Sequence, residues 1–509
     1  MKNISIAIVD ENKLFTIRLK LFLIQEEFKT VKTYHSINEL LEEKINFDLI
    51  IMDEEKFEDI FLKTFPNTIF LLISNEIKDS ENFRIFYIIK NFSNNMLKQE
   101  IEIISLIKNY EKEVNKKNEE LKKALEYISE QADIAATKQL NMIFDNVSFK
   151  RIGNYCFDNY YSPKDKLSGD SYIAWQTNGY IFISIIDAMG KGIGASLTAT
   201  LTSGIGNYIL DKESTLENIL ANLINYIKNI LLDNEALCML LLKINLKTNE
   251  FKIANFGMPP IYIKKGKEIE KIRSNNRPIL KNSKEKIIID TYKKEFDMML
   301  LMSDGLIEST NEEGIPYYVN FKKILPESDF LREIINDFKK NAIQDDDTTV
   351  YAILKQKYNY ETLYENSFTF SSKKDLDNII NTIEKYIHTD EITKQKIYLT
   401  LQEILLNIYE HAYRTNYDKQ KILEKNQDFT QINGKIYIKI SQNSKYFNII
   451  IKDDGRGFDV SKILRLENKH NFKRFHRRGL LLILNMVSGL FFEDNGRRVN
   501  IYIRKNNGN

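Results

Sequence analysis

Residues 97–142 contain neither proline nor glycine and carry many charged side chains. Apolar residues recur in this stretch at steps of three, four or seven, at Ile107, Tyr110, Val114, Leu121, Ala124 and Ile128. That period predicts one long amphipathic helix that separates the chain before it from the chain after it. Two such helices could pair as a parallel coiled coil; a solvated connector helix remains the alternative, because Lys117 and Gln131 would occupy seam positions.

Length, charge and cysteine content limit the number of domains, the partners and the compartment that we expect for this chain. For 509 residues, at about 150 residues per domain, about three to four domains are expected. The 73 basic and 71 acidic residues leave a net charge of +2, so we expect neither nucleic acid nor a membrane surface as a partner. Two cysteines, Cys156 and Cys238, suit a reducing compartment. Without an apolar run long enough for a signal peptide or a membrane span, we expect a cytoplasmic protein.

The pattern around the long helix predicts a multidomain chain. Before it, short apolar runs alternate with amphipathic stretches such as residues 15–28, which indicates a doubly wound parallel α/β sheet. After it come short strands, glycine turns and acidic loop ends, typical of an α+β sandwich. Near residues 368–370 a strand and a capping box of Ser372 with Asp375 begin another α+β domain. The expected boundaries are 1–105, 106–140 for the linker helix, 141–357 and 366–509.

Polar side chains end the predicted strands of the first region, where parallel sheets place their sites: Asp10, Glu11, Asp53, Ser74 and Lys90. Three carboxylates can hold Mg²⁺ against an incoming phosphoryl group, and a hydroxyl and an ammonium can take the remaining charge. Acids that only cap helices would give the same pattern.

This arrangement resembles the response-regulator receiver family over residues 1–105. The resemblance implies the following roles: phosphoacceptor Asp53; Mg²⁺ ligands Asp10, Glu11 and Asp53; switch residues Ser74, Tyr87 and Lys90. Asn91 stands where the family usually has proline, and the short intervals on either side of Ser74 imply a shortened receiver with a reduced helix. A receiver kept only for dimerisation is the alternative.

Four acidic loop ends punctuate the middle region, each next to an apolar strand run: Asp170, Asp187, Asp304 and Asp345. Oxygen ligands favour Mg²⁺ or Mn²⁺, and two such ions about 4 Å apart can activate a water for attack on a phosphate. Taken singly, an Asp-Gly pair is more often a turn than a ligand.

The ordered set resembles the metal-dependent serine/threonine phosphatases of the SpoIIE and RsbU type, with support from residues 255–260 and 277–280. The resemblance implies that Asp187 bridges two metals with the Ala188 carbonyl assisting. Asp304 and Asp345 would complete one metal site, and Asp170 would support the other. Asp346 is a register alternative to Asp345. Met258 replaces a frequent histidine, and a metal-free scaffold is the competing interpretation.

In the last region Glu403, Asn407 and His411 follow at i, i+4 and i+8 and share one helix face. Asparagine can ligate a phosphate-bound Mg²⁺, and a glutamate one turn earlier can orient or deprotonate a hydroxyl. Asp453 follows an apolar run and could accept the adenine amino group, with glycines letting the base approach. A solvated polar stripe and an acidic hairpin are the simpler interpretations.

Together with Gly479 before an apolar helix, these residues resemble the histidine-kinase-like ATPase fold in its RsbW-type serine-kinase form, a two-layer α+β domain. The resemblance implies these roles: Mg²⁺–ATP ligand Asn407; candidate base Glu403; adenine ligand Asp453; pocket glycines Gly455, Gly457 and Gly479. Arg477 stands where the lid of the family usually has another glycine.

The combination indicates a bacterial partner-switching response regulator. By resemblance, its substrate is a STAS-domain anti-sigma-factor antagonist, dephosphorylated on serine or threonine by the middle domain, phosphorylated by the C-terminal domain, and controlled by phosphorylation of Asp53. Expected cofactors are two Mn²⁺ or Mg²⁺ ions for the phosphatase, Mg²⁺ for the receiver and Mg²⁺–ATP. Further expected partners are a sensor histidine kinase, a sigma factor and a second copy joined through the linker helix. The alternative is a scaffold that binds an anti-sigma factor or antagonist without chemistry.

Overall fold

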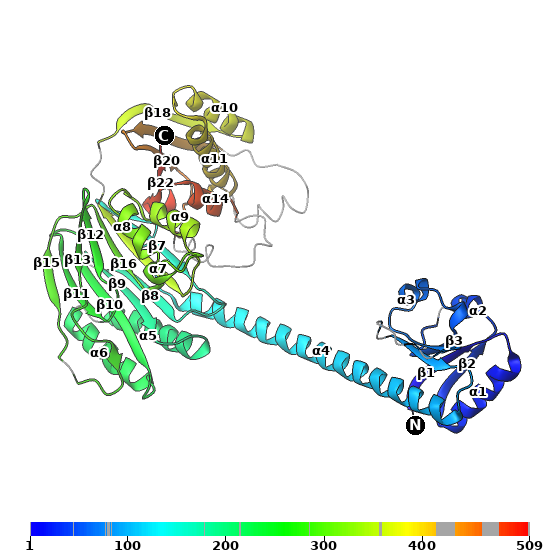
Figure 1. Cartoon of the computed structure of the whole chain (residues 1–509). Helices are drawn as coiled ribbons and strands as arrows, with labels where there is room; N and C mark the ends of the chain where they lie inside the picture. The colour runs from blue at the N-terminus through cyan, green and yellow to red at the C-terminus, as the bar shows by residue number, and fades with distance from the viewer. Residues whose placement is uncertain are drawn as a thin grey trace. The chain divides into compact units, whose positions relative to one another are not determined.

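A computed structural model of the chain describes residues 2–43, 45–76, 78, 82, 84–177, 179–212, 215–284, 286–355, 359–413, 433–460 and 478–506. The chain divides into two compact units, Met1–Glu130 and Gln131–Asn509, coloured blue to cyan and cyan to red in Figure 1. The two domains predicted for residues 141–357 and 366–509 thus lie within one compact unit. None of the described helices combines the length and apolarity needed to cross a membrane.

The first unit is built on a five-stranded parallel sheet of order β2-β1-β3-β4-β5, which confirms the predicted parallel α/β architecture. Helices α1 and α4 pack on one face of the sheet and α2 and α3 on the other. Between β4 and β5 the described residues form no helix. The elements are β1 (Lys2–Val9), α1 (Lys13–Gln25), β2 (Phe28–Tyr34), α2 (Ile37–Glu42), β3 (Leu49–Asp53), α3 (Ile60–Thr64), β4 (Ile69–Ser74) and β5 (Ile85–Ile89).

The amphipathic stretch predicted over residues 15–28 extends three residues past the end of the helix. Helix α1 ends at Gln25, and Glu27 adopts a left-handed backbone with φ 71°. Phe28 then begins β2. The reason is visible in the burial of β2, where Phe28, Val31 and Tyr34 are buried at steps of three and so extend the helical period past the end of the helix.

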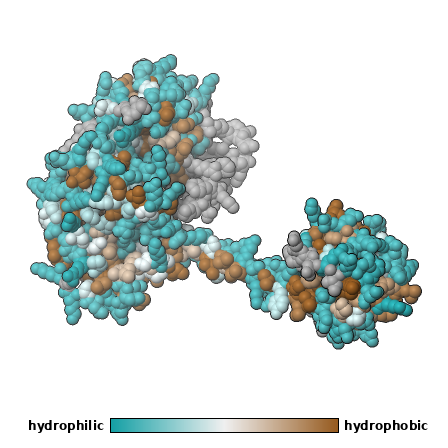
Figure 2. Space-filling view, viewed as in Figure 1, coloured by the Kyte–Doolittle hydropathy of each residue, from teal (hydrophilic) through white to brown (hydrophobic). Residues whose placement is uncertain are grey.

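The predicted long helix is present as α4 (Asn94–Met142). Its first turns bury Leu97, Ile101 and Ile104 in the first unit. Its middle part exposes 53 % of Val114, 58 % of Leu121 and 62 % of Ile128, and Figure 2 shows hydrophobic side chains among hydrophilic ones along it. The helix is therefore confirmed, and its pairing stays a prediction.

The second unit begins with a sandwich of two six-stranded sheets whose facing sides share one buried core. Helices α5 and α6 cover the outer face of one sheet and α8 and α9 that of the other. One sheet contains β8 (Asp170–Thr177), β9 (Tyr180–Ala188), β10 (Ala236–Asn245), β11 (Glu250–Phe256), β14 (Ile279–Leu280) and β15 (Asp290–Lys293); the other contains β6 (Arg151–Ile152), β7 (Tyr155–Ser162), β12 (Ile261–Lys265), β13 (Glu268–Ile272), β16 (Met298–Met302) and β17 (Thr348–Lys355). The helices are α5 (Ile193–Lys212), α6 (Leu216–Ile230), α7 (Gly305–Glu308), α8 (Tyr318–Ile324) and α9 (Leu331–Asn341).

A five-stranded antiparallel sheet of order β18-β19-β20-β22-β21 follows. Three helices pack on one of its faces, which gives the expected two layers. The predicted capping box is present, since Ser372 and Asp375 exchange side-chain and backbone hydrogen bonds at the start of α10. The elements are β18 (Glu361–Phe370), α10 (Lys373–Glu384), α11 (Glu391–Asn407), β19 (Gly434–Gln442), β20 (Tyr446–Asp453), α14 (Arg478–Met486), β21 (Gly489–Glu493) and β22 (Arg498–Arg504).

Helix α9 lies between the sandwich and this sheet. Tyr446, Phe491 and Tyr502 project from the sheet face opposite α10 and α11 and join the same buried cluster as Phe330 and Ile334. Figure 1 shows α9 beside α14 and β22.

Candidate functional site

Two of the predicted acidic side chains face each other across one strand pair of the sandwich. Asp170 begins β8 and stands opposite Asp187, near the end of β9. Asp170 is 2 % exposed, and its Oδ2 accepts a hydrogen bond of 2.7 Å from Thr349 Oγ1. The Ala188 amide donates to the carbonyl of Gly169 (3.0 Å), so the loop before β8 and the end of β9 are tied together.

The loops after β16 and before β17 come to the same edge. Asp304 lies two residues after the end of β16 and is the N-cap of α7. Next to it, a Cβ on Gly305 would collide with the carbonyl of Asp347, so only glycine allows this approach. Asp347 in turn accepts hydrogen bonds from the amides of Gly169 (2.6 Å) and Lys164 (2.8 Å). Segments that are far apart in the sequence therefore meet at one end of the sandwich.

Electrostatics show which carboxylates lie near one another. Burial raises the pKa of Asp187 well above its usual range, and the charges of Asp304 and Asp346 raise it further. Burial, followed by the charge of Asp187, raises the pKa of Asp170. The pKa of Asp304 is raised by burial, Glu308 and Asp346. Desolvation and mutual repulsion thus act on the same group of side chains.

Asp345 does not share this environment. Its Oδ2 accepts hydrogen bonds from the amide and hydroxyl of Thr310 (2.9 and 2.7 Å), and these bonds lower its pKa. Asp346, the register alternative, faces the acidic group and pairs with Lys191 at 3.1 Å. The structure therefore brings Asp170, Asp187, Asp304 and Asp346 together and directs the carboxylate of Asp345 elsewhere.

The donor chemistry of this edge suits hard divalent cations, because the side chains are carboxylates crowded in a partly buried place. Within the described residues, no group of three His, Cys, Asp or Glu side chains lies close enough together to hold one ion.

Three contributors to this edge carried no predicted role as ligands or phosphate contacts: Lys191, Asp347 and Glu308. Lys191 lies in the glycine turn after Asp187, with Gly190 and Gly192 at φ 99° and 80°. The sequence signal that could have identified Lys191 is its position between two turn glycines. Asp347 was missed because three consecutive aspartates do not show which of them faces the site.

The second candidate site lies at the end of α11. Glu403 and Asn407 occupy its last turns, and a Cβ on Gly479, at the start of α14, would collide with Glu403 Oε2 and lie 3.9 Å from Asn407 Nδ2. The structure thus joins these three predicted residues. His411 falls in a π-helical turn, Ile408–Ala412, directly after Asn407; such turns are frequent at functional sites.

Asp453 ends β20 and is 7 % exposed. It accepts a hydrogen bond of 2.8 Å from the amide of Gly455, and burial raises its pKa. A Cβ on Gly455 would lie 2.7 Å from Ala412 Cβ, and Gly457 has φ 71°, so both positions require glycine. Arg477 lies outside the described residues.

Some of the predicted site residues of the first unit line one hollow, and the others lie outside it. Asp53, Ser74 and Lys90 line one hollow of about 510 Å³, and Lys90 Nζ lies 3.7 Å from Asp53 Oδ2. Glu11 instead pairs with Lys56 at 2.7 Å, and the charges of Asp10 and Asp53 also raise the pKa of this lysine. Asp10 accepts from the Asn12 amide (2.7 Å), and Tyr87 packs beside the core on the α2 and α3 side.

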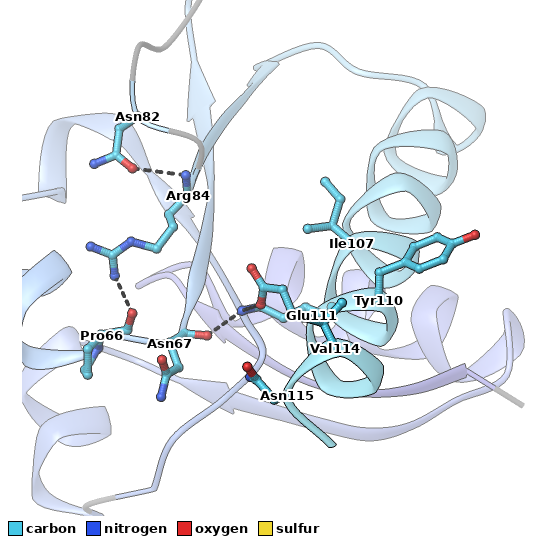
Figure 3. Close-up of a pocket in the computed structure, with 10 residues that line it drawn as sticks. Pro66, Asn67, Asn82, Arg84, Ile107, Tyr110, Glu111, Val114 and Asn115 are labelled. Carbon is cyan, nitrogen blue, oxygen red and sulfur yellow. Dashed lines mark hydrogen bonds and ion pairs between the residues drawn. The ribbon is translucent and has the colours of Figure 1, made fainter. Parts of the chain in front are cut away.

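A larger hollow, of about 1110 Å³, lies beside α4 in the same unit (Figure 3). Arg84 Nη1 donates to the carbonyls of Leu62, Phe65 and Pro66, and Lys108 Nζ donates to Asn67 O and Glu111 Oε2. The charged side chains that line this hollow, Arg84 and Lys108, bond to neighbouring groups of the protein. No predicted site residue lines the hollow.

Comparison with known proteins supports two domain types. Residues 177–355 match the family described as stage II sporulation protein E (SpoIIE), and residues 373–503 match the histidine kinase-like ATPase domain. The chain therefore carries a SpoIIE-type phosphatase domain followed by a histidine-kinase-like ATPase domain.

Two curated relatives are both stage II sporulation protein E. That of Priestia megaterium is 28% identical over 202 residues, which are 37% of this chain and 34% of the relative. That of Bacillus subtilis (strain 168) is 29% identical over 145 residues, 28% of this chain and 17% of the relative. The chain thus matches about a third or less of their length. Among solved structures, the RsbU and RsbW domains of a Mycobacterium tuberculosis protein align at 14% identity and a TM-score of 0.37, over 70% of this chain and 96% of that one.

Proposed function

We propose that this chain, with a SpoIIE-type phosphatase domain and a histidine-kinase-like ATPase domain, is a partner-switching regulator. The phosphatase domain removes a phosphoryl group from a serine or threonine of a STAS-domain anti-sigma-factor antagonist, and the ATPase domain adds it to the same partner. The observation that carries the proposal is the meeting of Asp170, Asp187, Asp304 and Asp346, from four separate segments, at one edge of the sandwich.

The phosphatase residues have distinct tasks. Asp187 lies within reach of the charges of Asp170, Asp304 and Asp346, so these carboxylates, with the Ala188 carbonyl assisting, would together hold the Mg²⁺ or Mn²⁺ ions. Such ions supply a water of lowered pKa and neutralise phosphate oxygens. Thr349 holds the Asp170 carboxylate in place. Lys191, 60 % exposed beside Asp346, is placed to hold an oxygen of the incoming phosphoserine.

Asp346 replaces Asp345 in this assignment. The carboxylate of Asp345 is engaged by Thr310, which fixes the loop that presents Asp346. Asp345 is thereby a positioning residue, and Asp346 is the third ligand beside Asp187 and Asp304.

In the ATPase domain, Asn407 would hold the Mg²⁺ of ATP, Glu403 would act as base toward the partner's hydroxyl, and Asp453 would accept the adenine amino group. Their support is the packing of Gly479 on Glu403 and the glycine turn beside Asp453. Both are close approaches of backbone to functional side chain, as nucleotide pockets require.

The first unit would act as a shortened receiver that takes a phosphoryl group on Asp53 from a sensor histidine kinase. Asp10 and Glu11 would hold Mg²⁺, while Ser74, Tyr87 and Lys90 would respond to the phosphoryl group. The hollow that Asp53 shares with Ser74 and Lys90 supports this assignment. Helix α4 would join two copies of the chain. The proposed domain limits are 1–105, 106–140, 141–357 and 366–509. A sigma factor would be the downstream partner.

Paired variants test the two opposing reactions. Asp187→Asn should abolish metal-dependent release of phosphate from the phosphorylated antagonist and leave its labelling by ATP intact. Asn407→Ala should do the reverse. The measurement is transfer and release of labelled phosphate on one purified STAS-domain protein, and loss of both activities in either variant would refute two separate sites.

The competing candidate function is a scaffold that binds the antagonist or anti-sigma factor without chemistry. A scaffold would form a stoichiometric complex with the STAS-domain protein but would yield neither phosphoprotein from ATP nor phosphate from the phosphorylated form.

A further inference from the structure

The phosphatase and ATPase domains share a buried aromatic contact. Phe330, directly before α9, packs its ring against Tyr446 and Tyr502 of the ATPase sheet, with centroid distances of 5.2 and 4.9 Å. A Cβ on Gly489 would lie 2.6 Å from Phe330 Cδ1, so the start of β21 is shaped to admit this ring. The segment of the phosphatase domain directly before α9 therefore packs against the ATPase sheet.

Glu333, in the first turn of α9, is the polar centre of this contact. Its side chain is 8 % exposed and pairs with Arg504 at 3.3 Å. It also accepts hydrogen bonds from Tyr446 OH (2.9 Å) and Ser488 Oγ (3.2 Å). All three partners belong to the ATPase domain. A buried carboxylate depends on such partners, so movement of any of them is transmitted to α9.

A second contact involves the neighbouring residue of the same helix, Arg332. Phe149 is fully buried in the ATPase core with a left-handed backbone of φ 57°, and its carbonyl accepts from the Phe492 amide at 2.7 Å. The guanidinium of Arg332 lies 5.2 Å from the centre of the Phe149 ring and bonds the buried Asp158 of β7. A bulky residue at positive φ persists only where its surroundings impose it, so this junction is tightly determined.

Helix α14 connects this junction to the proposed nucleotide site. Ser488 follows α14, whose first turn places Gly479 against Glu403. Helix α14 also lies against α9 (Figure 1). A change at the nucleotide that moves α14 therefore acts on the bond between Ser488 and Glu333.

The other end of α9 leads to the phosphatase site. The helix ends at Asn341, and the Ile343 amide then donates to the Thr310 carbonyl at 2.8 Å. Thr310 also holds Asp345, and Asp346 is the next residue. One helix thus connects the ATPase pocket to the loop that presents an acidic side chain to Asp187.

We infer that nucleotide binding in the ATPase domain alters the 343–347 loop through α9, with Glu333 as the joint, so that one domain sets the activity of the other. The inference rests on the two sites of the proposed function. By linkage, any effect of nucleotide on the phosphatase site is matched by an equal effect of that site on nucleotide affinity.

The test is hydrogen exchange of the full chain with and without ADP, at a constant excess of Mg²⁺. ADP carries no phosphoryl group for transfer to a hydroxyl, so only occupancy is probed. We expect ADP to change the exchange rate of amides in residues 343–347 about fivefold or more, the lower end of coupling between sites. The double variant Tyr446→Phe with Ser488→Ala keeps the aromatic packing but removes two bonds to Glu333, and should lose most of this change. Ser488→Ala alone serves if the double variant does not fold.

Tyr437→Phe is the matched control. Its hydroxyl also bonds a glutamate of the same sheet, Glu365, at 2.6 Å, but away from α9, so it should keep the full ADP effect. The inference is overturned if ADP does not bind, if it leaves the wild-type loop unchanged, or if the double variant keeps the full change. Hydrolysis of p-nitrophenyl phosphate by the same samples separates the two ideas: an ADP effect on the loop without hydrolysis supports the coupling and rejects the phosphatase function.

Discussion

Three consecutive aspartates, Asp345 to Asp347, end in three different environments. Asp345 is bonded by Thr310, Asp346 faces Asp187 and pairs with Lys191, and Asp347 accepts two backbone amides. Sequence alone left Asp345 and Asp346 as register alternatives. The hydrogen bonds of Thr310 decide between them, because a carboxylate already held by a hydroxyl and an amide points away from its neighbours.

We predict that Asp346→Asn lowers kcat/KM for p-nitrophenyl phosphate about 100-fold or more. Loss of a group supporting a metal ligand already costs about 10–100-fold, and a direct ligand should cost at least as much. Asp345→Asn should stay within about tenfold of wild type, since only loop positioning suffers. Steady-state kinetics at saturating Mn²⁺ measure both, and the reverse ranking would restore Asp345 as the ligand.

Gly479→Ala should abolish nucleotide binding without unfolding the chain. The added methyl group would collide with Glu403 Oε2, so Glu403 or the start of α14 must move out of the pocket. Calorimetric titration with ADP measures the loss. Gly194→Ala is the control, because a Cβ there meets nothing within 4 Å; equal ADP affinity in both variants would show that the close approach is unimportant.

Helix α10 begins at the capping box that the sequence predicts. At the start of α10, hydrogen bonds from Ser371 and Ser372 lower the pKa of Asp375 to about 2, below about 3.9 in an unfolded chain. Because the folded pKa is the lower one, Asp375 stabilises the helix start above about pH 4 and loses this effect as the pH falls toward 2.

Asp375→Asn should therefore speed hydrogen exchange in the first turns of α10 at pH 6, and the difference from wild type should shrink as the pH approaches 2. Exchange rates corrected for intrinsic pH dependence provide the measurement. Asp377→Asn, on the same helix but outside the box, is the control. A difference that is constant with pH would exclude the carboxylate as its cause.

Helix α4 leaves an apolar seam exposed at Val114, Leu121 and Ile128, so the predicted parallel pairing can be tested directly. Leu121→Glu with Ile128→Glu should convert a dimer of the full chain to monomers, because two rows of like charge would face each other in the seam. Analytical ultracentrifugation measures the mass, with Lys122→Glu, off the seam, as control. A wild-type monomer at high concentration would favour the connector-helix interpretation.

For the molecule as a whole, the arrangement of domains along the chain predicts control of the phosphatase by the first unit. Treatment with a small phosphodonor should change the phosphatase rate of wild type and leave Asp53→Asn unaffected, because the asparagine side chain has no carboxylate to accept the phosphoryl group. The rate on the phosphorylated antagonist is the measurement. Equal rates of treated wild type and Asp53→Asn would disconnect the first unit from catalysis.

Local patterns accounted for several of the elements. The period of residues 97–142 predicted α4, the Ser372–Asp375 box predicted the start of α10, and acids at strand ends marked Asp170, Asp187 and Asp304. Strand β2 was missed, because its buried residues at steps of three imitate a helix. The close contact of Gly479 with Glu403 was also beyond reach, since a sequence shows a glycine but not what lies beside it.

The sequence by itself determined which segments become helices and strands and which chemistry their ends carry, because hydrophobic period, caps and residue type act over a few neighbouring positions. Only the tertiary structure decided that Asp346 rather than Asp345 faces Asp187, and that α9 joins the phosphatase domain to the ATPase-like domain through Glu333. Those outcomes depend on contacts between residues that are far apart in the sequence, such as Asp345 with Thr310 and Glu333 with Tyr446, and no local pattern specifies such a pair.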